Sequence, residues 1–344
     1  MKPTDFAYYL TNFLSKYLPD IAGFSPNTIM SYRDSFSLFL NFCSEQKKIK
    51  PEEFSLDNLS RNLVEDYLEW LEKSRNCVAS TRNVRLAALH SFCRYLQMEF
   101  PDYIYTIQQI LSIPLKRTKK VSVEYMSLDA MKRLLEKPDK MTQKGRRDMV
   151  LLSLLYDSGA RVQELADLKV GDIRTTSPST IKLTGKGNKT RIVPLMKPMS
   201  DLLRQYLKEN SLTEPYTFDY PLFCNRSKKK LTRGGIDYIV KKYANKVIKE
   251  SPELFPSRLS SHCFRHSKAL HLLQSGVNLI YIRDFLGHVN VQTTEIYARI
   301  DGEMKRKALE KNANNSIILD KMPEWQNNSD LMKWLKKLGK GENI

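Results

Sequence analysis

The chain has 344 residues, enough for two domains, and its content of 41% hydrophobic and 27% charged residues excludes a wholly disordered protein. It carries 56 Lys and Arg against 38 Asp and Glu, a net charge of +18, which indicates a polyanionic partner. Charge alone does not show whether that partner is DNA, RNA or anionic lipid. It also does not exclude a soluble basic protein that has no such partner.

The five cysteines are scattered and include no C-x-x-C pair, which argues against a disulfide framework or a structural zinc site and favours a reducing compartment. The first residues show no signal-peptide pattern, and no apolar run approaches the roughly 18 residues that span a bilayer. We therefore expect a cytoplasmic protein without a membrane segment.

The first hundred residues predict helices. Ser25-Pro26 is a good cap and first-turn pair, and apolar residues follow it at helical spacing from Ile29 to Cys43. A second amphipathic stretch runs from Leu63 to Leu71, and a third helix is predicted to begin at a Ser80 cap.

The third predicted helix has an apolar face and a basic face. The apolar face is Val84, Ala88, Phe92 and Leu96, and the basic face is Arg82, Arg85 and Arg94. Each arginine taken singly is best interpreted as part of a solvated face. Together, in a basic protein, Arg82 and Arg85 are candidates to contact DNA phosphates.

The segment from Ser112 to Val123 combines a proline, several Ser and Thr, and a burst of positive charge that includes Lys119 and Lys120. This composition predicts an interdomain linker. A basic linker that includes Lys119 and Lys120 could also cross a polyanion, but a linker is the safer interpretation.

The second part resumes with helices, one capped by Ser127 with Leu128, Met131, Leu134 and Leu135 inside, and one over Met149–Tyr156 closed by Ser158-Gly159. Strand-like Thr180–Thr184 and Arg191–Pro194 flank the turn Gly185-Lys186-Gly187-Asn188-Lys189, which predicts a β-hairpin. Further helices are predicted over 199–207, 235–248, 265–275 and 279–286. The fold class is therefore mainly α with a small antiparallel β-hairpin. Met332, Trp334, Leu335 and Leu338 mark a last amphipathic helix, which could dock on its own domain or on a neighbouring subunit.

Arg161 follows Gly159-Ala160 at a predicted helix start, where backbone N–H groups and a guanidinium could bind a phosphate together. The alternative is an ion pair with Glu164, three residues later. The two interpretations are compatible, because a carboxylate can hold an arginine in position for a phosphate.

His262 and Arg265 lie three residues apart, on one face of a predicted helix, and His266 and His271 follow. The residues around them lack the further ligands that a metal site needs, so we expect no metal. His288 follows Leu286-Gly287 just past a helix, where glycine is a natural C-cap, so it could also be a simple capping residue.

Tyr297 has an ordinary phenol, with a pKa near 10, that needs a cationic pocket or a nearby base to attack phosphorus. A lone tyrosine is more often a core or interface residue. Lys186, in the glycine-rich turn, could protonate a leaving 5′ oxygen. Lys189 and Arg191 compete for this role, and the whole turn could instead contact the DNA backbone.

Taken together and in this order along the chain, the motifs resemble those of the tyrosine recombinase (integrase) family, including Xer-type resolvases and transposon integrases. The residues that carry the resemblance are Ala160-Arg161-x-x-Glu164-Leu165, Gly185-Lys186-Gly187-Asn188-Lys189-x-Arg191, His262-x-x-Arg265-His266, Leu286-Gly287-His288 and Tyr297. The likeness is strong over residues 125–299. It is fainter in the N-terminal helices, where Thr28-x-x-x-Tyr32 and Thr81-x-x-x-Arg85-Leu86 are similar to a core-binding domain.

The resemblance implies a two-domain, C-shaped clamp around double-stranded DNA. Its parts would be a helical, SAM-like core-binding domain over 1–111, a basic linker over 112–124, a catalytic domain over 125–315 and a tail over 316–344 whose helix could pack in trans. It also implies inverted-repeat core sites, a dimer on each site and a homotetramer on two synapsed sites. The residues expected to bind DNA are Arg82, Arg85, Lys119, Lys120, Lys189 and Arg191.

The resemblance further implies that Tyr297 attacks the scissile phosphate, leaving a 3′-phosphotyrosyl bond and a free 5′ hydroxyl, with a Holliday junction as intermediate. Arg161 and Arg265 would hold the non-bridging oxygens, Lys186 would protonate the leaving oxygen, His262 would assist proton transfer at Tyr297, His288 would hydrogen-bond the phosphate, and Glu164 would support the site. No cofactor is expected. The alternatives are type IB topoisomerase-like relaxation, or a non-catalytic DNA-binding protein of the same fold.

Overall fold

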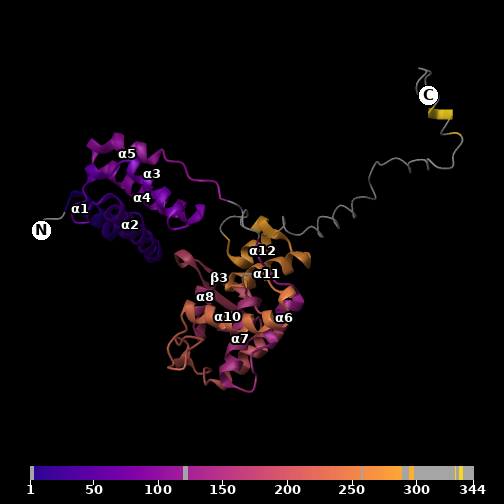
Figure 1. Ribbon diagram of the computed structural model, residues 1–344. Coiled ribbons are helices and arrows are strands. Elements are labelled where there is room, and N and C mark those ends of the chain that lie inside the picture. Colours follow the sequence, from indigo (N-terminus) through magenta and orange to yellow (C-terminus); the bar gives the residue numbers. More distant parts are fainter. Residues whose placement is uncertain are drawn as a thin grey trace. The chain divides into compact units, whose positions relative to one another are not determined.

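The computed structural model describes residues 4–118, 123–256, 259–288, 294–297, 330 and 333–335. The chain divides into two compact units, Met1–Ser122 and Val123–Ile344 (Figure 1). Lys119 and Lys120, which we expect to contact DNA, lie outside the described residues, as do Met332 and Leu338 of the predicted last helix.

The first unit is helical in its described part. Its main elements are α1 (Asp5–Asn12), which continues into a π-helical stretch (Phe13–Ile21), α2 (Pro26–Lys47), α3 (Arg61–Lys73), α4 (Ala79–Glu99) and α5 (Ile104–Leu111). Ser25 caps α2 by accepting a hydrogen bond from the Thr28 backbone N–H, which confirms that predicted start. The predicted Ser80 cap is wrong, because α4 begins at Ala79 and Ser80 lies in its first turn.

Phenylalanine and leucine side chains make up most of the core of the first unit. The ring of Phe92 makes edge-to-face contacts with Phe6, Phe13 and Phe36, with centroids 5.3–5.5 Å apart. Val84, predicted on the same face of α4, is 49% exposed. Steps of four residues drift by about 40° each around a helix, so Val84 leaves the face that Ala88, Phe92 and Leu96 form.

Of the three arginines of α4, Arg82 and Arg85 contact other helices of the unit, whereas Arg94 is exposed. Arg82 is only 7% exposed, and its Nε lies 3.9 Å from Glu72 Oε2 on α3. Arg85 Nη1 donates to Ser35 Oγ of α2 at 2.8 Å. The prediction of a solvated face is therefore wrong for Arg82, and these contacts favour a structural role over the predicted phosphate contact for both residues.

The predicted linker begins as part of the first unit. Ile113 is buried in its core. Asn83 of α4 donates to the backbone carbonyl of Lys116 at 2.8 Å and accepts from the Lys116 N–H at 3.0 Å. The chain is therefore fastened to α4 as far as Lys116.

The second unit contains α6 (Leu128–Glu136), α7 (Gln143–Asp157), α8 (Val162–Ala166), β1 (Ile173–Arg174), β2 (Thr180–Thr184), β3 (Thr190–Pro194), α9 (Lys197–Glu209), α10 (Arg233–Glu250), α11 (Ser261–Gln274) and α12 (Leu279–Leu286). The strands form an antiparallel sheet in the order β1-β2-β3, with Leu183 opposite Arg191. The predicted hairpin and the mainly helical fold class are confirmed, and β1 is an additional strand.

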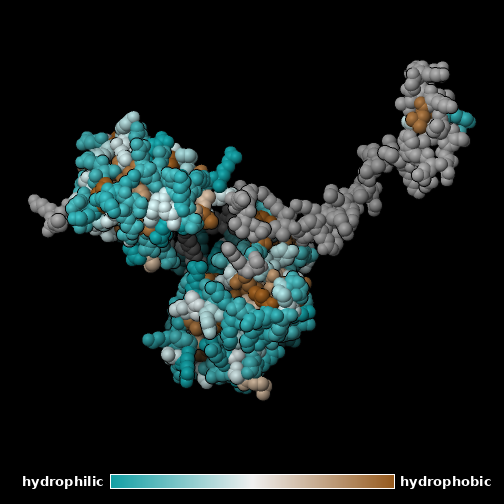
Figure 2. Space-filling model, viewed as in Figure 1, coloured by the Kyte–Doolittle hydropathy of each residue, from teal (hydrophilic) through white to brown (hydrophobic). Residues whose placement is uncertain are grey.

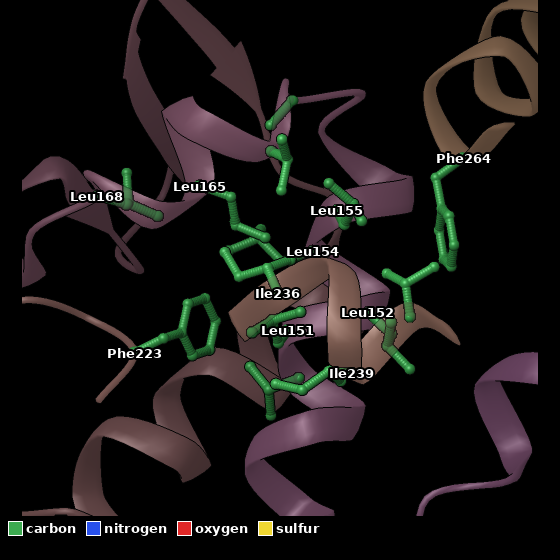
Figure 3. Close-up of a cluster of buried hydrophobic side chains, with 14 of the residues drawn as sticks. Leu151, Leu152, Leu154, Leu155, Leu165, Leu168, Phe223, Ile236, Ile239 and Phe264 are labelled. Atoms are coloured by element: carbon green, nitrogen blue, oxygen red, sulfur yellow. The ribbon is translucent and has the colours of Figure 1, made fainter. Parts of the chain in front are cut away.

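Helix α7 lies at the centre of the second unit, where it packs against α6, α9 and α11. Leu151, Leu152, Leu154 and Leu155 are all fully buried, so α7 is apolar on most of its circumference (Figure 3). The Ser127 cap of α6 is confirmed. Leu128, predicted inside, is 63% exposed, and the buried face of α6 starts instead at Ala130 and Met131.

Within the described part of the chain, no helix is long and apolar enough to cross a membrane. Hydrophilic residues cover most of the visible surface of both units (Figure 2). The cytoplasmic location stays a prediction.

Candidate active site

Arg161 lies between α7 and α8 and is the N-cap residue of α8, as predicted. Its backbone N–H donates to Glu164 Oε2 and its Nη1 donates to Glu164 Oε1, both at 2.8 Å. The ion pair considered in the sequence is therefore present. The Arg161 side chain still keeps 37% of its surface exposed, whereas that of Glu164 keeps 2%. Arg161 can thus bind Glu164 on one side and an external anion on the other.

Glu164 also binds Arg191, which reaches it from β3. Arg191 Nη1 donates to Glu164 Oε1 at 2.9 Å and Arg191 Nη2 donates to Glu164 Oε2 at 2.8 Å. Burial raises the pKa of Glu164, but the hydrogen bonds and charges of Arg191 and Arg161 outweigh it and hold that pKa at about 2. Glu164 is therefore a carboxylate at any physiological pH.

Arg191 also ties β3 to the end of α12, because its Nε donates to the backbone carbonyl of Phe285 at 3.0 Å. Its side chain is only 11% exposed, so the predicted DNA contact does not match its position. The alternation of residues along β3 indicates that Arg191 points inward, since Arg191 shares a face of the strand with the buried Val193. The role that this geometry supports is to hold Glu164.

Two glycines make room for this ion pair. A Cβ atom on Gly185 would lie 2.8 Å from Glu164 Oε1, and a Cβ on Gly287 would lie 2.9 Å from Arg191 Cδ. Gly287 also has φ +65° and ends α12, as predicted for a glycine C-cap. The backbones of the hairpin turn and of the α12 end thus approach the ion pair closely.

Arg265 on α11 is buried and connects the segment after α7 with the end of α12. Its Nη1 donates to the Gly159 carbonyl at 2.7 Å and its Nη2 to the Leu286 carbonyl at 2.6 Å. Burial, together with the positive charges of Arg161 and Arg191, lowers its pKa to about 9, so the guanidinium is still charged at pH 7. Its remaining N–H groups can serve an anion.

His288 follows Gly287 directly, and its Nδ1 lies 2.9 Å from Thr294 Oγ1. Burial, together with the charges of Arg265, Arg161 and Arg191, lowers its pKa to about 4. The imidazole is therefore neutral at pH 7 and can donate or accept a hydrogen bond without adding charge.

Tyr297 is 1% exposed and packs in a small apolar cluster with Ala269, Leu270, Leu273, Ile282 and Leu286. Its Oη lies 2.9 Å from His266 Nδ1. Burial raises the pKa of Tyr297, while the charges of Arg265 and Arg161 lower it, so its hydroxyl lies within the field of both arginines.

His262, expected to assist Tyr297, is exposed on the preceding turn of α11, with its ring centroid 6.3 Å from that of His266. The hydrogen-bond partner of Tyr297 is instead His266, the residue after Arg265, for which the sequence predicts no role. The spacing could have indicated His266 as a candidate, because His262 and His266 are four residues apart and so share one helix face.

Lys186 lies in the short 3-10 turn Lys186–Asn188 that joins β2 to β3. It directly follows Gly185, at which a Cβ would lie 2.8 Å from Glu164 Oε1 and 3.6 Å from Arg161 Nη1, so the turn leaves the sheet beside the arginine cluster. Lys189 at the end of the turn is exposed. The structure therefore gathers Arg161, Arg265, His288 and Tyr297 in one place, with α11 packed on α12 and α12 on β3 (Figure 1).

Comparison with known proteins gives a consistent result. The sequence profile of the phage integrase family matches residues 124–304, and that of the phage integrase N-terminal SAM-like domain matches residues 11–99. The chain is 32% identical over 98% of its length to a putative integrase/recombinase, y4rC, of Sinorhizobium fredii, covering 99% of that protein. It is 31% identical over 81% of its length to the tyrosine recombinase XerD of Listeria innocua, covering 89% of it.

Among solved structures, the XerH site-specific recombinase bound to a palindromic difH substrate matches 84% of the chain and 80% of its own, with a TM-score of 0.64 at 23% identity. A lambda integrase dimer bound to a core site matches 86% and 78%, with a TM-score of 0.61 at 15% identity. At these identities the two structures show a shared fold. Since the family profile spans more than half of the sequence and the curated relatives align over most of it, the chain belongs to the phage integrase family and is a tyrosine recombinase.

Proposed function

We propose that this recombinase cuts and rejoins double-stranded DNA at specific sites through a covalent 3′-phosphotyrosyl bond to Tyr297. The observation that carries the proposal is the convergence of Arg161, Arg265, His288 and Tyr297, which come from four separate segments of the chain. In the described part of the cluster, three arginines, Arg161, Arg191 and Arg265, lie near the carboxylate of Glu164, so the cluster favours an anion such as a phosphodiester.

In the proposed step, Tyr297 gives up its hydroxyl proton to a histidine, its Oη attacks the phosphorus, the Oη–P bond forms and the bond from phosphorus to the 5′ oxygen breaks. Lys186 protonates that leaving oxygen. Arg161 and Arg265 donate to the non-bridging oxygens, where negative charge grows in the transition state. One phosphate ester replaces another, so a 5′ hydroxyl can reverse the step, or join a new strand, without an added energy source.

Glu164 and Arg191 take no part in bond making in this scheme. Arg191 binds both Glu164 oxygens, and Glu164 binds the backbone and side chain of Arg161. We assign them as positioning residues that hold Arg161 toward the phosphate. Neutral His288 would hydrogen-bond a phosphate oxygen.

The same proposal covers domains and assembly. The SAM-like profile match supports residues 1–111 as the core-binding domain, followed by the linker 112–124, the catalytic domain 125–315 and the tail 316–344. We propose that the domains close as a C-shaped clamp around each inverted-repeat half-site, with a dimer on each site and a tetramer on two. A lambda integrase tetramer bound to a Holliday junction, of similar fold, supports this assembly. Proposed DNA contacts are Lys119, Lys120 and Lys189. We assign structural roles to Arg82, Arg85 and Arg191, which contact Glu72, Ser35 and Glu164.

The test is a nicked duplex carrying the sequence that the protein selects from a random DNA pool, so that the cut fragment diffuses away and the covalent product accumulates. We expect an adduct with the wild type and none with Tyr297→Phe. Tyr156→Phe is the matched control, because the Oη of Tyr156, a half-buried tyrosine, also lies within hydrogen-bond distance of a histidine Nδ1, that of His271 at 2.8 Å. An adduct with Tyr297→Phe would contradict the assignment of the nucleophile.

A further inference from the structure

The hydroxyl of the proposed nucleophile lies against one histidine. Tyr297 Oη and His266 Nδ1 are 2.9 Å apart, with ring centroids at 5.7 Å and planes inclined by 54°. This separation is that of a hydrogen bond and lies within the reach required of a general base. In the tautomer that carries its proton on Nε2, Nδ1 accepts from the Tyr297 hydroxyl.

His262 is separated from Tyr297 by His266. The three rings form a series in which Tyr297 is buried, His266 is half-buried and His262 is exposed. The centroid distances are 5.7 Å for the first pair and 6.3 Å for the second. A proton that leaves Tyr297 therefore meets His266 first, and the outer histidine lies toward solvent.

We propose that His266 accepts the proton of Tyr297 when the phosphotyrosyl bond forms and returns it when the strand is rejoined, so that His266 is a further catalytic residue. This assignment rests on the proposed function. In the forward step the Tyr297 O–H bond breaks, its proton moves to Nδ1, and the freed electron pair forms the Oη–P bond. The 5′ oxygen takes a separate proton from Lys186.

The charged surroundings suit this exchange. The groups that face His266 are His262 and Arg265 of α11, His288 after α12, and Tyr297 itself. Burial, together with His262 and Arg265, lowers the pKa of His266 to about 4, so His266 is neutral and able to accept a proton at pH 7. A phosphodiester bound at Arg265 would bring negative charge, which raises the basicity of the imidazole when it is needed.

The variants His266→Ala and His266→Asn separate proton transfer from positioning. The asparagine side chain can keep a hydrogen bond to Tyr297 but cannot take its proton. We expect both variants to bind the selected DNA as the wild type does and to form the covalent adduct about 10²–10⁴-fold more slowly in single-turnover reactions.

His271→Asn is the matched control. His271 lies on the same helix, is also half-buried, and makes a Nδ1 hydrogen bond of 2.8 Å to a tyrosine, Tyr156. Loss of this second His–Tyr pair changes α11 in a similar way without touching Tyr297. We expect the adduct to form at the wild-type rate.

A second substrate has sulfur in place of the bridging 5′ oxygen at the scissile phosphate. A thiolate leaves without a proton, so this substrate is expected to restore cleavage by Lys186→Ala and to leave His266→Asn slow, because His266 acts on the nucleophile. Restoration of both variants would assign His266 to the leaving group and overturn the proposal.

Three other results would overturn it. Wild-type rate in His266→Ala would show that the contact has no catalytic part, and wild-type rate in His266→Asn would show that it only positions the ring. A faster reaction of His266→Ala would mean that the histidine restrains Tyr297. Failure of the wild type to form any adduct on the selected DNA would overturn the proposed function itself, which is distinct from a fault limited to His266.

Discussion

Arg191 of β3 and Glu164 of α8 pair through two parallel hydrogen bonds of 2.9 and 2.8 Å, and the same carboxylate holds Arg161. Three elements therefore meet at one buried charge, since Arg191 also binds the Phe285 carbonyl at the end of α12. The geometry of the anion site depends on an ion pair that takes no part in the proposed bond making.

Replacing Arg191 by alanine leaves the Glu164 carboxylate buried with one partner fewer. We expect the free energy of opening of α8 and β3 to fall by about 3–5 kcal/mol, measured by amide hydrogen exchange. Arg191→Lys should restore little, because lysine lacks the planar fork. Arg204→Ala is the control, since its pair with Asp201 is more than half exposed and should contribute at most about 1 kcal/mol. Unchanged exchange in Arg191→Ala would contradict the role assigned to the pair.

Glu164 also predicts a dependence of stability on acid. Its pKa in the folded chain, about 2, lies below the ordinary value of 4.5. Its ionised form therefore stabilises the fold fully above pH 4.5, and this contribution is lost as the pH falls through about 2. Urea unfolding followed by circular dichroism should show a steeper loss of stability over this range in the wild type than in Glu164→Gln. Parallel curves would show that Glu164 does not carry the effect.

Gly287 combines a left-handed backbone with a close contact to Arg191, and Gly276 separates the two effects. Gly276 has φ +87° and open space at its Cβ position, whereas a Cβ on Gly287 meets Arg191 Cδ at 2.9 Å. Gly276→Ala should cost about 1–2 kcal/mol of stability and leave adduct formation unchanged. Gly287→Ala should cost more and slow the adduct, because it displaces Arg191 and the His288 backbone. Equal effects of the two substitutions on adduct rate would rule out this explanation.

Exposed Lys189 in the hairpin turn is a proposed phosphate contact. Lys189→Gln should make the slope of log affinity against log salt shallower by about 0.9, with little change in the preferred DNA sequence. Fluorescence anisotropy with labelled duplex over a salt series measures the slope. Arg204→Ala, which removes an exposed charge already paired with Asp201, provides the comparison. An unaltered slope in Lys189→Gln would remove this residue from the interface.

Local structure could be predicted where a short pattern determines the backbone. The structure confirms four such predictions: the Ser25 cap, the Ser127 cap, the hairpin around Gly185–Lys189 and the Gly287 end of α12. Caps and turns are predictable because they depend on neighbouring residues. The motif order also predicted the family. Patterns read over longer helical runs were less accurate, as the exposure of Val84 and Leu128 shows.

The sequence by itself determined which groups the site contains: the arginines, histidines and tyrosine, their order, and the elements that carry most of them. Only the tertiary structure decided how these groups pair. Arg191 meets Glu164 across 27 residues and His266 meets Tyr297 across 31. These contacts depend on how β3 packs near α8 and how α11 packs against α12. The hydrophobic periodicity of a single helix or strand does not predict which distant side chain it will contact.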